Sequence, residues 1–422
     1  MRIWLVSHNY APEATGIPVY NTALAEWLVR RGWDVSVLTG LPHYPWWEVP
    51  AAYAARRYHD GAGDERLRGV DVRRVRHFVP RQPVTTAARL RLDASYLASW
   101  LRRAPSLEEV PDVIVGIAPP FLIGALLLQL RLLTGAPVVY HAQDLQVDAA
   151  LELGMLPGWM GRMLRAAERW QLARMDLVTA CGAGMCRRIS AKGPLRARVR
   201  HWPNWTDTAA MQPWTVGEGA NPERAAWNLP EGAVVGLYSG NLGRKQGLGT
   251  LVQAARLLAD EPRWHCVIAG AGAERWPLER ACAGIERCRV EDLRPEDRLR
   301  PFLAAGDVHV IPQLRSAADL VLPSKLLNIL AMGRPVVATA DPGSELHDVV
   351  QEAGCGLVVP PEDPAALAGA LARLTADPGL RAEMGRRGRA WVVARLDQEI
   401  VLARIERTLR ALVRLAQLRR RR

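Results

Sequence analysis

The chain alternates short apolar strands with helices, and the loops between them carry glycine or polar residues. This alternation indicates an α/β architecture of two doubly wound parallel sheets with helices on both faces, in which ligands bind beyond the carboxyl ends of the strands. In the first run, strands are predicted over 3–7, 34–39, 112–117, 137–140 and 176–180, and helices over 18–31 and 121–133. In the second run, strands are predicted over 233–238, 264–269, 307–311, 335–338 and 356–359, and helices over 246–259, 273–283, 363–376 and 380–395.

The two runs predict two domains, because a polar stretch rich in Pro and Gly separates them. We expect Rossmann-like domains over 1–204 and 231–395 with a linker region over 205–230, and an active site in the cleft between the domains. Residues 396–422 predict a basic amphipathic helix, for which two compatible interpretations stay open. The helix packs back on the N-terminal domain with a solvated arginine face, or it contributes to binding an anionic membrane surface.

A short helix after Pro323 is the strongest candidate for an anion site. Pro323 can open it, and Gly333 followed by Arg334-Pro335 can end it. Ser324 and Lys325 then lie beside unpaired amides at the positive end of the helix dipole. Asn328 follows one turn later on the same side. This arrangement suits a phosphate with a hydroxylated group beside it.

A glycine loop over 238–248 occupies the equivalent of a first strand-to-helix turn in the second half. Gly240 and Gly243 allow a close turn, while Arg244 and Lys245 supply positive charge. The alternative is an ordinary glycine turn with solvated basic residues. Together with Lys325, these cations favour a diphosphate ligand.

The loop over 7–17 follows the first strand and precedes the first helix. Gly16 can let the backbone approach a donor closely next to a helix N-terminus, and Glu13 can accept a hydrogen bond from a sugar hydroxyl. The loop does not match the Gly-X-Gly-X-X-Gly dinucleotide pattern. The alternative is a tight turn with no ligand.

Three ionisable residues, His141, Asp144 and Asp148, follow a predicted strand in the first half. His141 can bind a sugar hydroxyl or take part in proton transfer. We select His141 and Asp144 as catalytic candidates. Asp148 is assigned to sugar or acceptor binding. The alternative for His141 is a core histidine whose hydrogen bonds are satisfied within the protein.

A formal charge of +12 implies anionic partners: nucleic acid, anionic lipid or phosphorylated small molecules. The six cysteines form no Cys-X-X-Cys pair and no His/Cys cluster with zinc spacing, so we expect reduced thiols in the cytoplasm. No signal peptide is expected, because the first apolar segment reads as a strand. There is no Asp-X-Asp motif for a metal–diphosphate bridge, so no metal or other cofactor is expected if the substrate is a nucleotide sugar.

These motifs resemble those of GT-B-fold, GT4-type retaining glycosyltransferases, and more closely those of the WcaI-type enzymes of colanic acid and related exopolysaccharide synthesis. The resemblance runs in order along the chain from residue 1 to about 400. Its matching segments are residues 9–17, 143–148, 203–205, 238–247 and 317–331.

The resemblance implies transfer of a sugar from a nucleoside-diphosphate donor, with GDP-fucose suggested, to an acceptor hydroxyl with retained anomeric configuration. The implied acceptor is a polyprenyl-diphosphate-linked oligosaccharide at the inner leaflet. A cytoplasmic protein, peripheral on an anionic membrane, would fit that acceptor. The departing phosphate would take the acceptor proton, while His141 orients the sugar and stabilises charge.

The resemblance also shows departures from the wider GT4 pattern. An Arg and a Lys that commonly hold the diphosphate fall at Asn241 and Gln246 here, so Arg244, Lys245 and Lys325 are the available substitutes. The second of two family glutamates falls at Asn328. The first has no clean match, and Asp319 is the nearest acidic residue. The WcaI-type pattern itself reads Pro-Ser-Lys-Leu with Asn after it.

Two rival functions stay open at the level of sequence. A GT-B sugar-nucleotide epimerase would share the phosphate-binding helix but needs a dedicated acid/base carboxylate set. A non-enzymatic protein that binds nucleic acid or membrane is motivated by the +12 charge. The interleaved aromatic and basic residues of a nucleic-acid module are not evident, so no nucleic-acid partner is expected.

Overall fold

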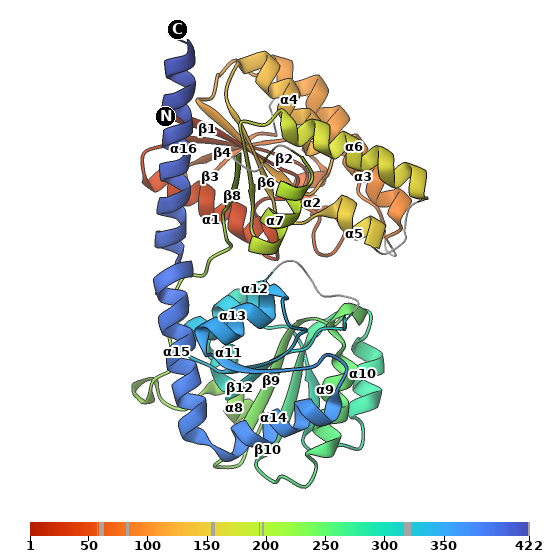
Figure 1. Cartoon of the computed structure of the whole chain (residues 1–422), viewed down its shortest axis with the longest axis vertical. Coiled ribbons are helices and arrows are strands. Elements are labelled where there is room, and N and C mark those ends of the chain that lie inside the picture. Colours follow the sequence, from red (N-terminus) through yellow and green to blue (C-terminus); the bar gives the residue numbers. More distant parts are fainter. Residues whose placement is uncertain are drawn as a thin grey trace. The chain divides into compact units, whose positions relative to one another are not determined.

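The computed structural model describes residues 1–56, 58, 63–81, 84–152, 157–193, 195, 198–315 and 322–420. The chain forms two compact units (Figure 1). Unit 1 comprises Met1–Pro203 and Leu402–Arg422, and unit 2 comprises Asn204–Val401. The division after Pro203 lies next to the end of the N-terminal domain expected over 1–204.

Unit 1 contains an eight-stranded sheet in the order β3-β4-β2-β1-β5-β6-β7-β8. Every neighbouring pair is parallel except β3 with β4. The strand order reverses between β1 and β5, and such a switch point opens a ligand crevice at the carboxyl ends of the strands. The strands are β1 (Arg2–Ser7), β2 (Asp34–Thr39), β3 (Glu65–Leu67), β4 (Val70–Arg74), β5 (Val113–Ala118), β6 (Val138–Ala142), β7 (Leu177–Ala180) and β8 (Val199–His201).

The helices of unit 1 connect these strands and cover the sheet (Figure 1). They are α1 (Ile17–Arg30), α2 (Ala51–Ala54), α3 (Thr86–Arg103), α4 (Ile123–Thr134), α5 (Gln146–Glu152), α6 (Gly158–Ala173) and α7 (Ala183–Ala191). The predictions for β1, β2, β5, β6, β7, α1 and α4 are confirmed to within a few residues. Elements with weak apolar patterns, such as the polar edge strand β3, were not predicted.

Unit 2 contains a six-stranded parallel sheet in the order β11-β10-β9-β12-β13-β14, with its switch point between β9 and β12. Its strands are β9 (Val234–Asn241), β10 (Trp264–Ala271), β11 (Cys288–Glu291), β12 (Val308–Ile311), β13 (Val336–Thr339) and β14 (Gly356–Val359). Its helices are α8 (Pro222–Ala226), α9 (Leu248–Leu257), α10 (Arg275–Cys282), α11 (Leu299–Ala305), α12 (Ser324–Ala331), α13 (Glu345–Ala353), α14 (Pro364–Ala376) and α15 (Pro378–Leu396).

Two apolar cores lie on opposite faces of the unit 2 sheet. Val234 and Tyr238 of β9 pack in a core with α9, α10 and α14. Val235 and Leu237 alternate with them and pack in a core with α11. A parallel sheet buried on both faces is therefore confirmed for this half, and it holds the carboxyl end of β9 in a fixed position.

The C-terminal helix α16 (Gln398–Arg420) confirms the predicted basic amphipathic helix. In unit 1 its apolar face is buried through Leu402, Ile405, Leu409 and Val413. Glu406 accepts a hydrogen bond from Trp33 Nε1 at 3.0 Å. These contacts match the interpretation of a helix packed on the N-terminal domain.

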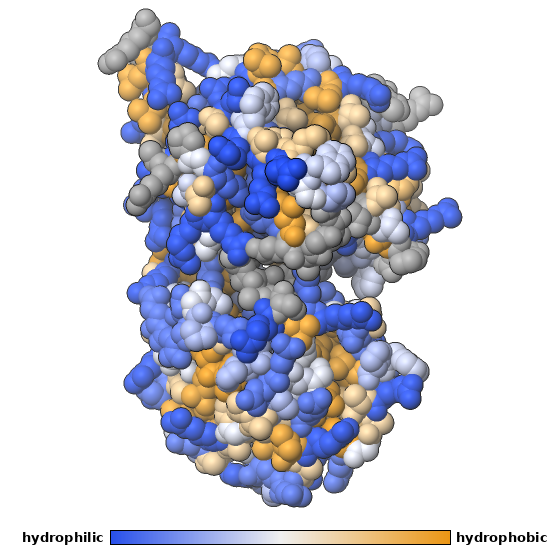
Figure 2. Space-filling view, turned by 45° about the vertical axis from the view of Figure 1, so that its right-hand side comes forward, coloured by the Kyte–Doolittle hydropathy of each residue, from blue (hydrophilic) through white to orange (hydrophobic). Residues whose placement is uncertain are grey.

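No helix in the described part of the chain is both long and apolar enough to cross a membrane. On the face drawn in Figure 2, hydrophilic side chains cover most of the surface and apolar ones occur in small groups.

Candidate active site

Lys325 and Gly240 meet at the switch point of unit 2. Gly240 lies at the carboxyl end of β9, and Lys325 lies in the first turn of α12, after β12. The Lys325 Nζ atom is 3.9 Å from the centroid of the Tyr238 ring. A Cβ atom at Gly240, whose φ is +145°, would lie 3.4 Å from Nζ. Glycine therefore leaves the backbone open beside the amine.

Burial lowers the pKa of Lys325 to about 7. Within the described residues, the Lys325 amine faces the Tyr238 ring and forms no ion pair. The charged and neutral forms of Lys325 are therefore similarly populated near neutral pH. An anionic ligand in contact with Nζ would favour the charged form. This is a suitable environment for one phosphate group.

The α12 helix has the termini that the sequence predicts. It begins at Ser324 after Pro323. At its other end, Gly333 has φ +65° and its amide donates to Leu330 O at 2.9 Å. The Leu326 amide donates to Pro323 O at 2.9 Å, so the Ser324 and Lys325 amides are the first-turn donors that lack an intrahelical acceptor. The exposed Ser324 hydroxyl is available at that end.

Asn328 has a partner within unit 2. Thr206 Oγ1 donates to Asn328 Oδ1 at 2.6 Å. A ribose hydroxyl would therefore meet the side-chain NH2 group, and the role of Asn328 in ribose binding stays a prediction. Asp319, the candidate for donor-sugar hydroxyls, lies outside the described residues.

The glycine loop places its two cations differently from Lys325. Arg244 is 91% exposed at its side chain, and its Nε lies 3.4 Å from Glu274 Oε1. Lys245 is also exposed. The structure thus brings Gly240 and Lys325 together but leaves the side chains of Arg244 and Lys245 toward solvent.

Asn241 and Gln246 line the turn at Gly243. A Cβ atom at Gly243 would lie 3.3 Å from Gln246 Oε1 and 3.4 Å from Asn241 Nδ2. The backbone of this turn is tied to the next loop, because Leu242 N donates to Ala271 O at 2.9 Å. Two uncharged amides therefore stand at the positions where the resemblance implies an Arg and a Lys.

In unit 1, Glu13 holds the loop that follows β2. The amides of His43 and Tyr44 each donate to Glu13 Oε1 at 2.7 Å. The other oxygen, Oε2, is buried and has no hydrogen-bond partner among the described residues. Gly16 has φ +77° and precedes α1, as expected for a turn into a helix N-terminus. A sugar hydroxyl would have to reach Oε2, since Oε1 already accepts hydrogen bonds from two backbone amides.

His141 is a buried, neutral histidine. Its Nδ1 lies 2.9 Å from Thr179 Oγ1 and its Nε2 lies 3.0 Å from Gln143 Nε2. Burial, with a smaller effect of His201, lowers the pKa of His141 to about 3. A ring of such low basicity is a poor proton carrier near neutral pH, and Gln143 would have to move before a substrate could bind Nε2.

The two aspartates near His141 do not share its environment. Asp148 pairs with Lys192 Nζ at 2.6 Å, and Lys192 also pairs with Glu168 at 2.6 Å. Asp144 is exposed on the loop before α5. Acceptor binding by Asp148 would compete with this ion pair, so the assignments of Asp144 and Asp148 stay predictions.

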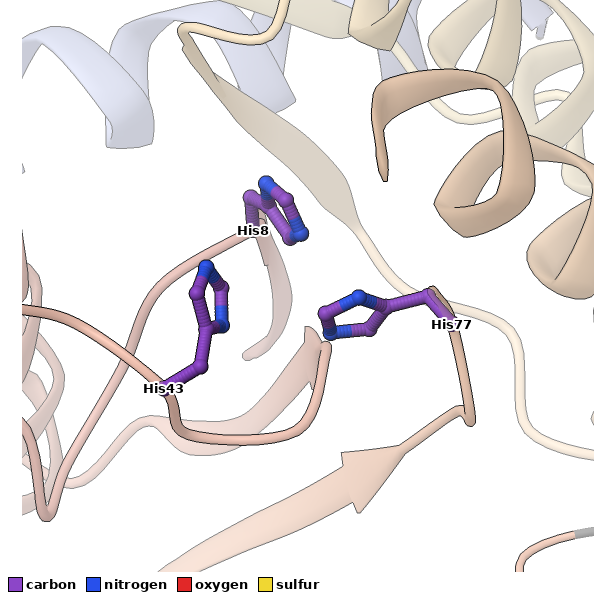
Figure 3. A group of neighbouring side chains, drawn as sticks. All are labelled: His8, His43 and His77. Atoms are coloured by element: carbon purple, nitrogen blue, oxygen red, sulfur yellow. The ribbon is translucent and has the colours of Figure 1, made fainter. Parts of the chain in front are cut away.

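Sequence reasoning missed one cluster in unit 1. His8, His43 and His77 each follow a strand, β1, β2 or β4, and these strands are neighbours in the sheet. The signal was available in the position of each histidine beyond a strand end. Only the strand order, however, shows that the three rings meet (Figure 3).

Comparison with known families gives two matches that together span most of the chain. Residues 15–205 match the glycosyl transferase 4-like domain, and residues 233–377 match the glycosyl transferases group 1. A curated relative is the putative colanic acid biosynthesis glycosyl transferase WcaI of Escherichia coli K12. It is 35% identical over 374 residues, which cover 87% of this chain and 90% of the relative.

Solved structures share the architecture of both units. Sucrose-phosphate synthase from Thermosynechococcus elongatus has a TM-score of 0.72 and 21% identity, covering 97% of this chain and 98% of that one. Anabaena Alr3699/HepE in complex with UDP-glucose has a TM-score of 0.69 and 16% identity, covering 97% and 100%. These similarities confirm the predicted GT-B fold class of two Rossmann-like domains.

Proposed function

Because the chain belongs to the group 1, GT4-type glycosyltransferases, we propose that it moves a sugar from a nucleoside-diphosphate sugar to an acceptor hydroxyl with retention of configuration. The observation that carries this proposal is the position of Lys325. Its amine lies at the N-terminus of α12 and beside Gly240, at the switch point of the unit 2 sheet. Both the amine and the helix end attract phosphate.

The leaving diphosphate is the group that Lys325 would serve. As the bond from the anomeric carbon to the diphosphate oxygen breaks, negative charge grows on that oxygen. A fixed ammonium group and unpaired helix amides stabilise this charge without a metal ion. The new bond forms from the acceptor oxygen on the same face of the sugar, and the departing phosphate takes the acceptor proton.

We propose that the acceptor is a lipid-linked oligosaccharide in exopolysaccharide synthesis and that the donor is GDP-fucose. The colanic acid relative supports the pathway class. The end of α16 offers a means of reaching an anionic membrane surface. Leu415 and Leu418 are more than half exposed there, among the exposed residues Arg414, Arg419 and Arg420.

Donor identity is tested by incubating the purified chain with GDP-fucose, GDP-mannose and UDP-sugars and measuring thermal stabilisation, since a ligand that binds only the native state raises its apparent stability. Transfer is then measured with the stabilising donor and a polyprenyl-diphosphate-linked acceptor. The same donor incubated without acceptor separates transfer from isomerisation. A product in which the donor sugar is isomerised without acceptor would support the epimerase function instead.

Lys325→Ala should lower turnover by at least about a hundredfold, the scale of losing one preorganised charge contact. Arg373→Ala is the control, because Arg373 is an exposed cation on α14 of the same unit. Both variants are checked for folding by circular dichroism. Transfer at near-wild-type rate by folded Lys325→Ala protein would contradict the donor-site assignment.

Deletion of residues 419–422 should weaken binding to anionic liposomes at low salt, because it removes the four arginines that end the sequence after the exposed Leu415 and Leu418. Co-sedimentation with vesicles of phosphatidylglycerol measures the change, and neutral phosphatidylcholine vesicles are the control. Equal sedimentation of the full and shortened chains would mean that the tail is only solvated.

A further inference from the structure

Three imidazole rings converge at the carboxyl edge of the unit 1 sheet. One ring nitrogen from each of His8, His43 and His77 lies within 4.8 Å of the corresponding nitrogens of the other two. The ring centroids are 5.3 Å apart for His8 and His43, 4.8 Å for His8 and His77, and 5.3 Å for His43 and His77. Figure 3 shows the rings arriving from three separate loops and facing a common centre.

Backbone carbonyls determine which nitrogen of two rings carries the proton. His43 Nδ1 lies 2.9 Å from Leu41 O, and His77 Nδ1 lies 3.0 Å from Phe78 O. A carbonyl oxygen only accepts hydrogen bonds, so each Nδ1 must be the donor. In a neutral ring the lone pair is then on Nε2. Protein metal sites orient their histidine ligands by this same bond to a backbone carbonyl.

The third ring offers an unused nitrogen. His8 is 5% exposed, and its Nε2 is buried without a hydrogen-bond partner among the described residues. Such a buried polar atom carries a desolvation cost that a ligand would offset. Tyr96 packs against the His8 ring with centroids 4.5 Å apart, which limits the movement of that ring.

The surroundings bring the Gly40 backbone and a buried carboxylate close to the cluster. A Cβ atom at Gly40 would lie 2.5 Å from His77 Nε2 and 3.1 Å from His8 Cδ2, so only glycine fits there. Glu13 Oε1 lies 3.8 Å from His43 Nδ1, and Glu13 Oε2 is buried without a partner among the described residues. A carboxylate at this distance compensates part of the charge of a cation bound by the imidazoles.

We propose that His8, His43 and His77 bind a divalent transition-metal ion of the zinc class through three imidazole nitrogens. Zinc–nitrogen bonds of about 2.0–2.1 Å place tetrahedral ligands about 3.4 Å apart, so the rings close in by about 1.4 Å from their widest separation. His77 Nε2 accepts a hydrogen bond from the Leu41 amide at 2.9 Å, and it would give up this bond to bind the metal. A tetrahedral ion held by three imidazoles would take water or another oxygen ligand in its fourth position.

The metal joins three loops that are otherwise held by hydrogen bonds. These loops follow β1, β2 and β4, and Glu13 already ties the first to the second through the His43 and Tyr44 amides. Binding therefore makes the metal a clamp on the carboxyl edge of unit 1. The site is independent of the donor site proposed in unit 2, so either proposal can fail without the other.

The test uses the full chain without a polyhistidine tag, stripped with a chelator and titrated with ZnCl2 by calorimetry. One ion per chain should bind, and the melting temperature should rise with zinc concentration. His8→Gln and His43→Gln should each weaken zinc binding by at least about a hundredfold, since each removes one of three ligands. His347→Gln on α13 in unit 2 is the matched control and should bind zinc like the wild type.

A second measurement covers the case in which a variant fails to fold. X-ray absorption at the zinc edge of the wild-type protein with one equivalent of zinc counts imidazole ligands directly, and three are expected. The proposal is overturned if zinc binding is not saturable near one equivalent. It is also overturned if folded His8→Gln and His43→Gln bind zinc like the wild type, or if fewer than three imidazoles coordinate the ion.

Discussion

Lys325 illustrates how one side chain acquires its chemistry from its surroundings. In water a lysine amine is charged at neutral pH, but here burial lowers its pKa to about 7. The ring of Tyr238, 3.9 Å from Nζ, gives a cation a weak attraction without a counter-charge. The amine is thus prepared for an anion rather than neutralised by a carboxylate among the described residues. That is the property expected of a group that receives a diphosphate.

Donor binding should therefore take up protons near pH 7.5. With a free-state pKa of about 7, most Lys325 amines are neutral at that pH, and a bound diphosphate raises the pKa. Affinity is greatest below pH 7 and falls as the pH rises above it. Calorimetry in buffers of different ionisation enthalpy measures the uptake. In Lys325→Arg the uptake should vanish because arginine stays charged, and uptake equal to the wild type would exclude Lys325 as its source.

The α12 helix is positioned by close contact with α15. A Cβ atom at Gly385 of α15 would lie 2.0 Å from Gly333 O, just after α12. At Gly388, one turn later, it would lie 2.8 Å from Leu330 Cδ2. Glycine thus lets α15 approach the end of α12, and the approach determines where Lys325 stands at the other end of the same helix. The helix boundaries of α12 follow from Pro323 and Gly333, but its position does not.

Gly385→Ala should destabilise unit 2 by about 1–3 kcal/mol, the usual cost of overpacking, and should weaken donor binding by displacing α12. Gly369→Ala in the middle of α14 is the matched control, because a Cβ atom there meets nothing within 4 Å. This control should stabilise the unit by about 0.5–1 kcal/mol through helix propensity. Denaturant unfolding measures both. An equal effect of the two substitutions would contradict the packing argument.

Across the whole molecule, buried histidines link stability to pH. His141 in unit 1 and His309 in unit 2 are both buried, and burial is the main cause that lowers each pKa to about 3. In the unfolded chain each takes up a proton near pH 6.5. Their contribution to folding is therefore complete above pH 6.5 and is lost as the pH falls toward 3. Asp93 has the opposite effect on the pH dependence of stability. Burial raises its pKa to about 7, so its contribution to folding is lost as the pH rises through 7.

The His309→Gln variant isolates one such contribution. Between pH 7.5 and pH 5 the wild type should lose about 2 kcal/mol more unfolding free energy than His309→Gln, the cost of about 1.5 pH units below the unfolded pKa. Glutamine can still donate to Leu303 O, which His309 Nε2 meets at 3.0 Å. Denaturant unfolding at the two pH values gives the difference. Parallel losses in both proteins would show that His309 does not titrate on unfolding.

Local elements were predictable from the sequence because their signals are local. Apolar runs such as 34–39 and 356–359 coincide with β2 and β14, and the stop at Gly333 was recognised from residue type alone. The surroundings of the site residues were less predictable. Asp148, predicted to bind sugar or acceptor, pairs with Lys192, and Glu13 Oε1 accepts hydrogen bonds from backbone amides. A carboxylate at a strand end has the same sequence signature whether it binds a substrate or holds a loop.

By itself, the sequence determined the alternation of strands and helices, the existence of two Rossmann-like halves and the boundaries of α12. Tertiary structure decided which residues meet. Strand order brings His8, His43 and His77 to one edge, and it places Lys325 over Tyr238 while Arg244 stays exposed. The physical reason is the range of the interactions along the chain. Helix ends and strands depend on residues that are close in sequence, whereas burial, pKa and ligand geometry depend on segments that only folding brings together.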